Sequence, residues 1–191
     1  VPFKTKQLIH MEDVSIKYDA NIICDNINLD VLQGDRVAIE GKNGSGKSSI
    51  LKLICGEKIE HGGTVQIGSG LIVSYLPQDV SFLSGSLKKY AIKKNLDETL
   101  FKTILRKLDF SRIQFEKDMN NYSLGQKKKV LIAQSLCEKS NLMIWDEPLN
   151  YIDIFSRMQI ENLLSEFKPT MIFVEHDKIF CDSIANKTIH I

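Results

Sequence analysis

The sequence lacks a long apolar run, a signal peptide and an excess of charge of either sign. No stretch approaches the roughly 18 consecutive apolar residues that a membrane-spanning helix requires, so we expect a cytoplasmic chain with no transmembrane segment of its own. Lysine and arginine number 25 against 24 aspartates and glutamates, which gives a net charge of +1. The charge of the whole chain therefore does not predict binding to nucleic acid or membranes, and any such surface must be local.

Paired cysteines are also absent. Cys24, Cys55, Cys137 and Cys181 are scattered without a C-x-x-C motif, which is typical of reduced thiols rather than of a disulfide framework or a zinc site. With 191 residues, 43% of them hydrophobic, the chain suits one domain over residues 1–191. Because it starts with Val-Pro-Phe-Lys and has no initiator methionine, we expect it to be a piece of a longer chain.

The central motif is a glycine-rich loop from Gly41 to Ser49, with the sequence Gly-Lys-Asn-Gly-Ser-Gly-Lys-Ser-Ser. It fills every fixed position of the phosphate-binding pattern G-x-x-x-x-G-K-[ST]. Residues 35–40 before it have strand spacing and residues 50–54 after it suit one face of a helix, which is the required order. We predict that the loop amides bind a polyphosphate, that Lys47 reaches its β and γ phosphates, and that Ser48 ligates the bridging Mg²⁺.

Short strands are predicted on both sides of this loop. Alternating apolar residues indicate two antiparallel strands before it, one leading to Tyr18 and one over residues 27–31, and further strands over residues 64–67 and 71–76. Tyr18 suits either stacking on a nucleotide base or simple packing. Gln78 follows a strand end, where a side chain can reach a metal or its water, although a loop glutamine alone is usually just solvated.

Residues 83–115 have a helical, lysine-rich character. Basic residues crowd this stretch, among them Lys88, Lys89, Lys93, Lys94, Lys102, Arg106 and Lys107. Two interpretations stay open: the solvated face of a small helical insert, or a contact surface for RNA or another acidic partner. Specific recognition of bases is not predicted here, because no interleaving of aromatic residues supports it.

The second half of the chain adds a helix cap and a pair of carboxylates. Ser123 can cap a helix over residues 127–139, and with Gly125 it makes a second helix N-terminus able to hold phosphate. Residues 141–145 have the pattern of a buried parallel strand that ends in Asp146 and Glu147. Because charges at such a strand tip need a partner, we predict that Asp146 holds Mg²⁺ and that Glu147 deprotonates the attacking water.

A further helix is expected around residues 155–167, followed by a buried strand over residues 170–174. This strand ends at His176. The carboxyl ends of parallel strands gather the ligand-binding groups of an α/β sheet. We therefore predict that His176 hydrogen-bonds a γ phosphate or the attacking water.

Taken in chain order, these motifs resemble those of ABC-type nucleotide-binding domains. Tyr18 resembles the base-stacking aromatic, residues 41–48 the Walker A loop, Gln78 the Q-loop, residues 122–126 the signature, residues 142–147 Walker B, residues 150–153 the D-loop, and His176 the switch histidine. The resemblance implies an α/β P-loop NTPase fold with a RecA-like core, an N-terminal antiparallel β layer and a helical subdomain over residues 82–138.

The resemblance also implies an ATPase with ATP and Mg²⁺ as cofactors. The ATP-binding residues would be Tyr18, Gly41, Asn43, Gly44, Ser45, Gly46, Lys47, Ser48 and Ser49. The metal would be held by Ser48, Gln78 and Asp146, and the catalytic set would be Glu147, His176, Gln78 and Lys47. Asn150 and Asp153 would form the D-loop.

A head-to-tail pair of such domains is implied as well, in which Ser123, Gly125 and Gln126 act on the ATP of the opposite domain. An isolated copy should then hydrolyse ATP poorly. Leu124 departs from the glycine that is common at its position in the family.

Residues 146–153 have the sequence Asp-Glu-Pro-Leu-Asn-Tyr-Ile-Asp. This is closer to the Thr-Asn-His-Leu-Asp of ABC-F translation proteins than to the Thr-Ser-Ala-Leu-Asp of transporters, and Asn150 carries most of this difference. The chain resembles the second domain of Lsa- and Vga-type ribosomal protection proteins, which confer resistance to lincosamides, streptogramin A and pleuromutilins. This implies a second nucleotide-binding domain and the ribosome, including its rRNA, as partners. The alternative is an energy-coupling subunit of a membrane ABC transporter.

Overall fold

Two β-sheets of opposite character organise the chain in the computed structural model, which describes residues 6–18 and 21–191. The antiparallel sheet has the order β2-β1-β4, with β1 at Gln7–Tyr18, β2 at Asn21–Leu32 and β4 at His61–Ile67. The parallel sheet has the order β5-β6-β7-β3-β8, with β5 at Val73–Leu76, β6 at Leu142–Asp146, β7 at Met171–Val174, β3 at Arg36–Glu40 and β8 at Lys187–His190. The predicted antiparallel layer and parallel α/β core are both confirmed.

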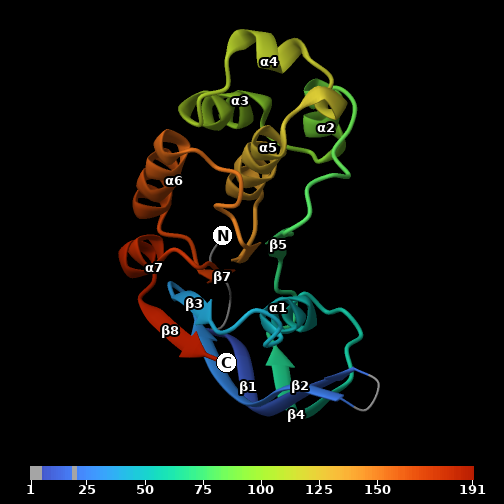
Figure 1. Ribbon diagram of the computed structural model, residues 1–191, viewed down its shortest axis with the longest axis vertical. Helices are drawn as coiled ribbons and strands as arrows, with labels where there is room; N and C mark the ends of the chain where they lie inside the picture. Colours follow the sequence, from blue (N-terminus) through green and yellow to red (C-terminus); the bar gives the residue numbers. More distant parts are fainter. Residues whose placement is uncertain (1–5, 19–20) are drawn as a thin grey trace.

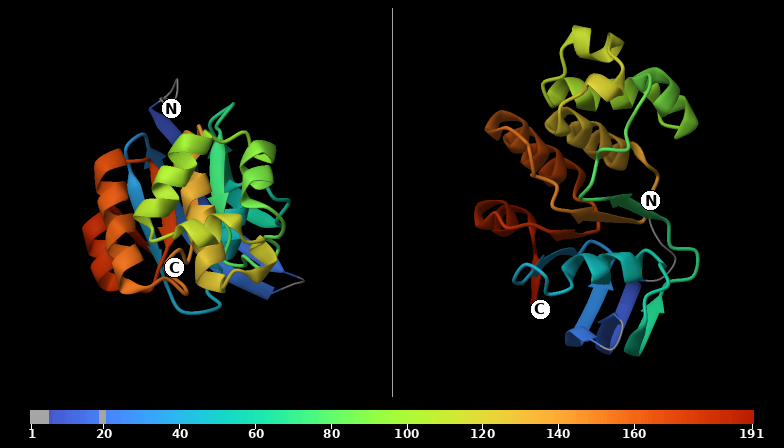
Figure 2. Two further views of the ribbon diagram at one scale, coloured as in Figure 1. Left: turned by 90° about the horizontal axis from the view of Figure 1, so that it is seen from above. Right: turned by 45° about the vertical axis from the view of Figure 1, so that its right-hand side comes forward.

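Helix α1 (Lys47–Ile54) lies between the two sheets (Figure 1). Its Ile50 and Leu51 are completely buried in a core shared with residues of both sheets. The other face of the parallel sheet is covered by α5 (Leu124–Cys137), α6 (Ile154–Phe167) and α7 (Lys178–Ile184), as the turned view in Figure 2 shows. The parallel sheet is therefore buried on both faces, as its continuous apolar strands predict.

The pleat of β6 divides its side chains between these two cores. Met143 and Trp145 pack toward the helices α5 and α6, whereas Leu142 and Ile144 pack toward α1. The indole Nε1 of Trp145 donates to Ser135 Oγ on α5 at 2.8 Å, so the polar atom of this buried ring is satisfied. The strand that leads to the two predicted carboxylates is thus fixed from both sides.

Three short helices form the end of the molecule that is far from the antiparallel sheet (Figure 1): α2 (Leu87–Lys93), α3 (Glu98–Lys107) and α4 (Arg112–Glu116). The Asp97 side chain caps α3 by accepting from Leu100 N at 2.8 Å. Asn95 and Asp109, just past α2 and α3, have left-handed φ angles of 52° and 64° that end these helices. The predicted helical subdomain is present, divided by its turns.

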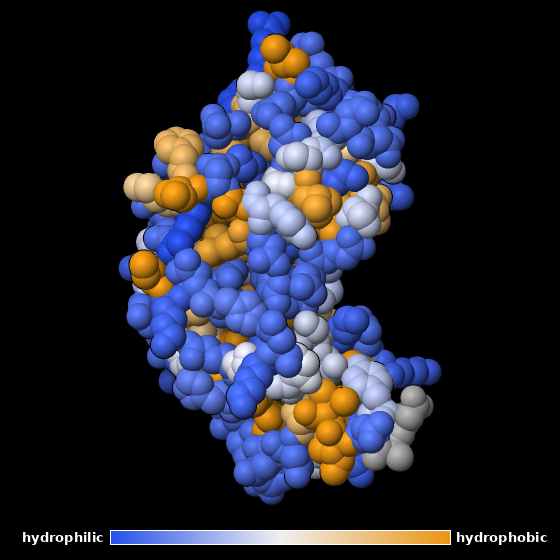
Figure 3. All heavy atoms as spheres, in the orientation of Figure 1, coloured by the Kyte–Doolittle hydropathy of each residue, from blue (hydrophilic) through white to orange (hydrophobic). Residues whose placement is uncertain are grey.

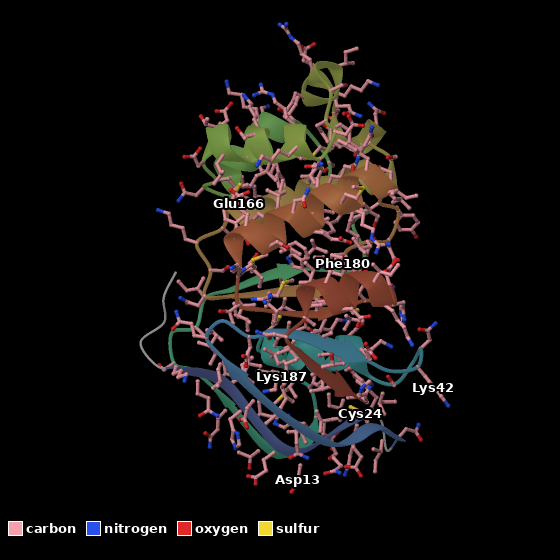
Figure 4. The ribbon with its side chains drawn as sticks, turned by 90° about the vertical axis from the view of Figure 1, so that its left-hand side faces the viewer. Asp13, Cys24, Lys42, Glu166, Phe180 and Lys187 are labelled. Atoms are coloured by element: carbon pink, nitrogen blue, oxygen red, sulfur yellow. The ribbon has the colours of Figure 1, made fainter. Side chains whose placement is uncertain are left out.

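Some element boundaries differ from those predicted. Helix α5 starts at Leu124 rather than at residue 127, because Ser123 is already its cap and accepts from Gln126 N at 3.1 Å. Helix α7 and strand β8 were not predicted. Helix α7 is held by Phe180, whose ring meets that of Phe173 edge to face at 5.5 Å; Figure 4 shows Phe180 in the interior. This contact packs α7 against β7, the strand directly before it in the chain.

The β1–β4 pairing generates a test of stability. Gly63 has a φ of +77°, and an added Cβ would lie 2.3 Å from the carbonyl oxygen of Asp13. Gly70 has a similar φ of +79° but open space around its Cβ position, which makes it a matched control. We expect Gly63→Ala to lower the free energy of unfolding by about 3 kcal/mol and Gly70→Ala by only about 1 kcal/mol, since the control adds backbone strain without a collision. Equal losses in urea unfolding would contradict this packing.

Candidate nucleotide-binding and catalytic site

The glycine loop runs from the end of β3 to the start of α1. Gly44 and Gly46 have left-handed φ angles of 81° and 93°, and Gly46 is the N-cap of α1. A Cβ at Gly41 would lie 2.4 Å from the carbonyl oxygen of Ile191, so this position also needs glycine. Lys47 Nζ donates to the carbonyl oxygens of Gly41 and Lys42 at 2.9 and 2.8 Å, which keeps the ammonium inside the loop. Lys42 itself projects outward (Figure 4).

A hollow of about 520 Å³ lies beside this loop. Its lining comes from β1, from β2, from the loop and from the ends of three parallel strands: Tyr18, Ile23, Asn43, Gly44, Gly46, Lys47, Ser48, Ser49, Gln78, Glu147 and His176. Most of the predicted ATP-binding and catalytic residues therefore meet around one cavity. Gly41, Ser45 and Asp146 are not in this lining.

Asp146 lies at the tip of β6 and is only 2% exposed. Its Oδ1 atom is buried without a hydrogen-bond partner, and the Ser48 side chain offsets only part of the effect of that burial on its pKa. Burial, followed by the charge of Glu147, raises the pKa of Asp146 above its usual range. The described part of the chain gathers no group of three or more His, Cys, Asp or Glu side chains for a metal. The carboxylate, the Ser48 hydroxyl and the Gln78 amide are nevertheless the oxygen donors that Mg²⁺ prefers, so the predicted set fits this ion.

Glu147 is surrounded by polar side chains from three segments. Gln78 Nε2 and Asn150 Nδ2 both donate to its Oε2 atom, at 2.7 and 2.6 Å. His176 Nε2 lies 3.4 Å from its Oε1 atom. The backbone of Glu147 has a left-handed φ of 49°, an uncommon conformation for a non-glycine residue that often marks functional sites. This arrangement suits a general base whose carboxylate is held in one orientation, which stays the predicted role of Glu147.

Tyr18 lies at the rim of the hollow. Its hydroxyl donates to Ser49 Oγ at 3.1 Å, and the residue is 44% exposed. The hydrogen bond fixes the ring beside the loop and leaves part of it accessible. Stacking on a base therefore stays a prediction that this geometry permits.

The predicted signature residues lie at the start of α5 and line no part of this hollow. Ser123 Oγ accepts from Gln126 N at 3.1 Å, and Gln126 Oε1 accepts from Ser123 N at 3.0 Å, which forms a capping box. A Cβ at Gly125 would lie 2.4 Å from the carbonyl oxygen of Tyr151. The glycine thus lets α5 approach the turn after β6. The action of these signature residues on the ATP of an opposite domain stays a prediction.

Three consecutive lysines on α5 were missed in the sequence. Lys127, Lys128 and Lys129 look like a solvated charge run, yet they are only 8%, 0% and 8% exposed. Lys128 Nζ donates to the carbonyl oxygens of Pro77 and Gln78, both at 3.1 Å, and burial lowers the pKa of this lysine to about 8. Their position in the first turns of a helix directly after a cap was the available signal, because that end of a helix can point into a site.

The two neighbouring lysines also bind loops. Lys127 Nζ donates to the carbonyl oxygen of Ser81 at 3.1 Å, and Lys129 Nζ lies 2.8 Å from the Asp153 carboxylate. Burial alone would raise the pKa of Asp153, but hydrogen bonds from Lys129 and Ser156 outweigh it and hold that pKa well below its usual range. The two predicted D-loop residues thus differ in their contacts. Asn150 donates a hydrogen bond to Glu147, whereas Asp153 caps α6 and forms an ion pair with Lys129 on α5.

The site combines a loop whose glycines have left-handed φ angles, a helix that begins at that loop, and a buried carboxylate at the end of a parallel strand. This combination defines a P-loop nucleotide-binding domain. The family model described as "ABC transporter" matches residues 24–150. The chain belongs to the ABC transporter family and contains its ATP-binding domain.

Relatives with curated descriptions support this membership. The ATP-binding protein Uup of Caulobacter vibrioides is 32% identical, over 96% of this chain and 32% of Uup. The ribosome protection protein VmlR of Bacillus subtilis is 28% identical, over 96% of this chain and 34% of VmlR. ABC transporter F family member 2 of Arabidopsis thaliana is 27% identical, over 97% of this chain and 28% of that protein. The chain thus spans about a third of the length of these relatives.

Solved structures show the same fold. The ATP-binding subunit of an ABC transporter matches with a TM-score of 0.79 and 22% identity, over 96% of this chain and 85% of that one. The archaeal ribosome recycling factor aABCE1, solved in complex with the stalk protein aP1, matches with a TM-score of 0.80 and 22% identity, over 100% of this chain and 38% of that one. At this identity the likeness shows the fold alone.

The surroundings of Glu147 generate a catalytic test. We expect Glu147→Gln to reduce ATP turnover by about 10²- to 10⁴-fold while ATP binding is kept, because the amide cannot accept the proton of the attacking water. Phosphate release and calorimetric ATP binding measure the two properties separately. Glu166→Gln, at the exposed end of α6 (Figure 4), is the control and should leave both unchanged. Near-normal turnover in Glu147→Gln would rule out the assignment of the base.

The burial of Lys128 generates a second test. Lys128→Met keeps most of the side-chain volume but removes both hydrogen bonds to the carbonyl oxygens of Pro77 and Gln78. We expect turnover to fall about tenfold because Gln78 is less firmly placed, and the melting temperature to fall as well, since two carbonyl oxygens lose their donor and the buried Asp146 loses a nearby cation. Lys139→Met, at an exposed position after α5, is the matched control. Unchanged turnover would show that Lys128 serves packing alone.

Proposed function

We propose that this chain is an ATP-hydrolysing half of an ABC-F protein that uses ATP to bind and leave the ribosome in antibiotic resistance. The observation that carries this proposal is Asn150, which marks the ABC-F type of D-loop and donates to the predicted base Glu147 at 2.6 Å. The similarity to a ribosome protection protein and to an F family member supports it. Such a protein would act in the cytoplasm, where the ribosomes are.

In this proposal, different residues in and beside the hollow bind the phosphates, hold the metal and accept the proton of the attacking water. The loop amides and Lys47 bind the phosphates of ATP, and Ser48, Gln78 and Asp146 hold Mg²⁺, which when bound offsets the phosphate charge. Glu147 accepts a proton from the attacking water, and its two amide partners keep the carboxylate turned toward that water. His176 lies close enough to contact the same water or the terminal phosphate.

A second nucleotide-binding domain completes the site in this proposal. Ser123, Gly125 and Gln126 lie outside the hollow of their own chain, so they are available to the ATP of a partner. Four apolar side chains in and just after the D-loop are each more than half exposed: Tyr151, Ile154, Phe155 and Met158. Figure 3 shows apolar side chains gathered over α6. A partner domain that covers this surface would bury them. ATP would then close the two halves, and hydrolysis would reopen them.

The alternative function is an energy-coupling subunit of a membrane transporter. The observation that favours it is the match of residues 24–150 to the family model described as "ABC transporter". Among residues 6–18 and 21–191, no helix has both the length and the apolar character needed to cross a bilayer. A transporter role would therefore need a separate membrane partner for this part of the chain.

Cosedimentation with ribosomes tests the two functions against each other. The full-length protein, carrying Glu147→Gln and the matching change in its other half, should stay closed with ATP. We expect saturable pelleting with purified ribosomes in ATP, none without nucleotide, and weaker binding as salt rises. A version that also carries Lys47→Ala is the control and should not pellet, because it cannot hold ATP. Absence of binding at every salt concentration would favour the transporter subunit.

A further inference from the structure

Helix α2 has an unusual concentration of positive charge. The segment from Phe82 to Leu96 contains four lysines and no carboxylate. Lys89, Lys93 and Lys94 are exposed, and none of the three forms an ion pair with a carboxylate in the part of the chain that the structure describes. The surface around α2, α3 and α4 is mostly hydrophilic (Figure 3). This charge is thus available to a ligand.

A hollow of about 430 Å³ lies at the start of this helix. It is lined by Phe82, Leu83, Ser84, Gly85, Ser86, Lys89, Tyr90, Lys93 and Lys94. Phe82 is 58% exposed, and Lys94 Nζ lies 6.0 Å from the centroid of the Tyr90 ring. The expectation of no interleaved aromatic residues is wrong, because Tyr90 stands between Lys89 and Lys93 and the loop before α2 brings Phe82 beside them.

The hollow is held in shape by the elements behind it. Gly85 N donates to Asp118 Oδ1 at 3.1 Å, and Met119 N donates to the carbonyl oxygen of Gly85 at 2.9 Å. The Tyr90 hydroxyl donates to Gln134 Oε1, which fixes α2 on α5. A ligand would therefore meet a largely preformed surface, and little ordering of the protein would oppose binding.

The chemistry of the lining distinguishes between acidic partners. Every cation in the lining is a lysine, a point charge that binds phosphate and carboxylate groups alike, so it is the exposed ring that separates one acidic partner from another. An exposed ring beside several lysines is the combination that stacks an unpaired base and holds its neighbouring phosphates. A paired base in a duplex could not reach the ring.

We propose that this hollow binds single-stranded RNA, with one base stacked on Phe82 and the adjacent phosphates held by Lys89, Lys93 and Lys94. The inference rests on the proposed ribosomal function, since an unpaired segment of ribosomal RNA is the occupant that such a function supplies. It extends that function by assigning a contact site on the helical subdomain, away from the nucleotide hollow.

Fluorescence anisotropy of the 191-residue chain with a labelled 12-nucleotide oligouridine tests the site directly. We expect Phe82→Ala to weaken binding about tenfold through lost stacking. The triple change Lys89→Gln, Lys93→Gln and Lys94→Gln should lower the slope of log affinity against log salt by about 2, because three phosphate contacts are lost. The control triple, Lys58→Gln, Lys139→Gln and Lys178→Gln, removes the same charge from exposed positions elsewhere and should keep the wild-type slope.

Three results would overturn the proposal: wild-type affinity in both hollow variants, equal affinity for a 12-base-pair RNA duplex, or equally tight binding of a polyglutamate peptide. Ribosome pelleting in ATP separates this site from the proposed function; for it, the full-length wild type and triple variant both carry Glu147→Gln and the matching change in the other half, so that they stay closed. If the wild type pellets and the triple variant pellets equally well, the site is wrong and the function stands. If oligouridine binds through the hollow but the wild type does not pellet, the site stands and the ribosomal function is wrong.

Discussion

The buried carboxylate of Asp146 is the constraint on which the rest of the site depends. Strand β6 is covered on both faces, so the charge at its tip is removed from water while its Oδ1 atom has no partner. The raised pKa of Asp146 means that the ionised form opposes folding once the pH is above the ordinary carboxyl range. A carboxylate is kept in such a place only if something offsets its desolvation. A cation held by Asp146 and Ser48 would offset this desolvation. The unfavourable burial of the carboxylate is then explained by its predicted role in binding a metal.

The second feature that organises the site is the set of buried lysines on α5. Lys128 binds the backbone of Gln78, and the Gln78 side chain binds Glu147. Lys129 binds Asp153, which lies three residues after Asn150. The Asn150 side chain donates to the same Oε2 atom of Glu147 as Gln78 does. Both amide partners of Glu147 are therefore positioned by consecutive residues of one helix. A shift of α5 would change both of them together, because the helix moves as a rigid element.

Much of this arrangement could be predicted from the sequence because its signals are local. The glycine loop, the strand ends at Gln78, Glu147 and His176, and the cap at Ser123 each depend on neighbours within a few positions. The burial of the three lysines had only the preceding cap as a local signal, since Lys127 and Lys128 bind carbonyl oxygens 46 to 51 residues away and Lys129 binds the Asp153 carboxylate. Helix α7, strand β8 and the position of Phe82 beside α2 depend on tertiary packing in the same way.

The segment of residues 77–86 connects the nucleotide hollow with the hollow on α2. Gln78 lies in one lining and Phe82 in the other, and between them Lys127 holds the carbonyl oxygen of Ser81. Only three residues lie between Gln78 and Phe82, so a displacement of the backbone at one of them shifts the other. A ligand on α2 can alter the surroundings of Glu147 only if it binds one arrangement of this segment more tightly than another. If it binds both equally, the hollow on α2 anchors the protein without affecting hydrolysis.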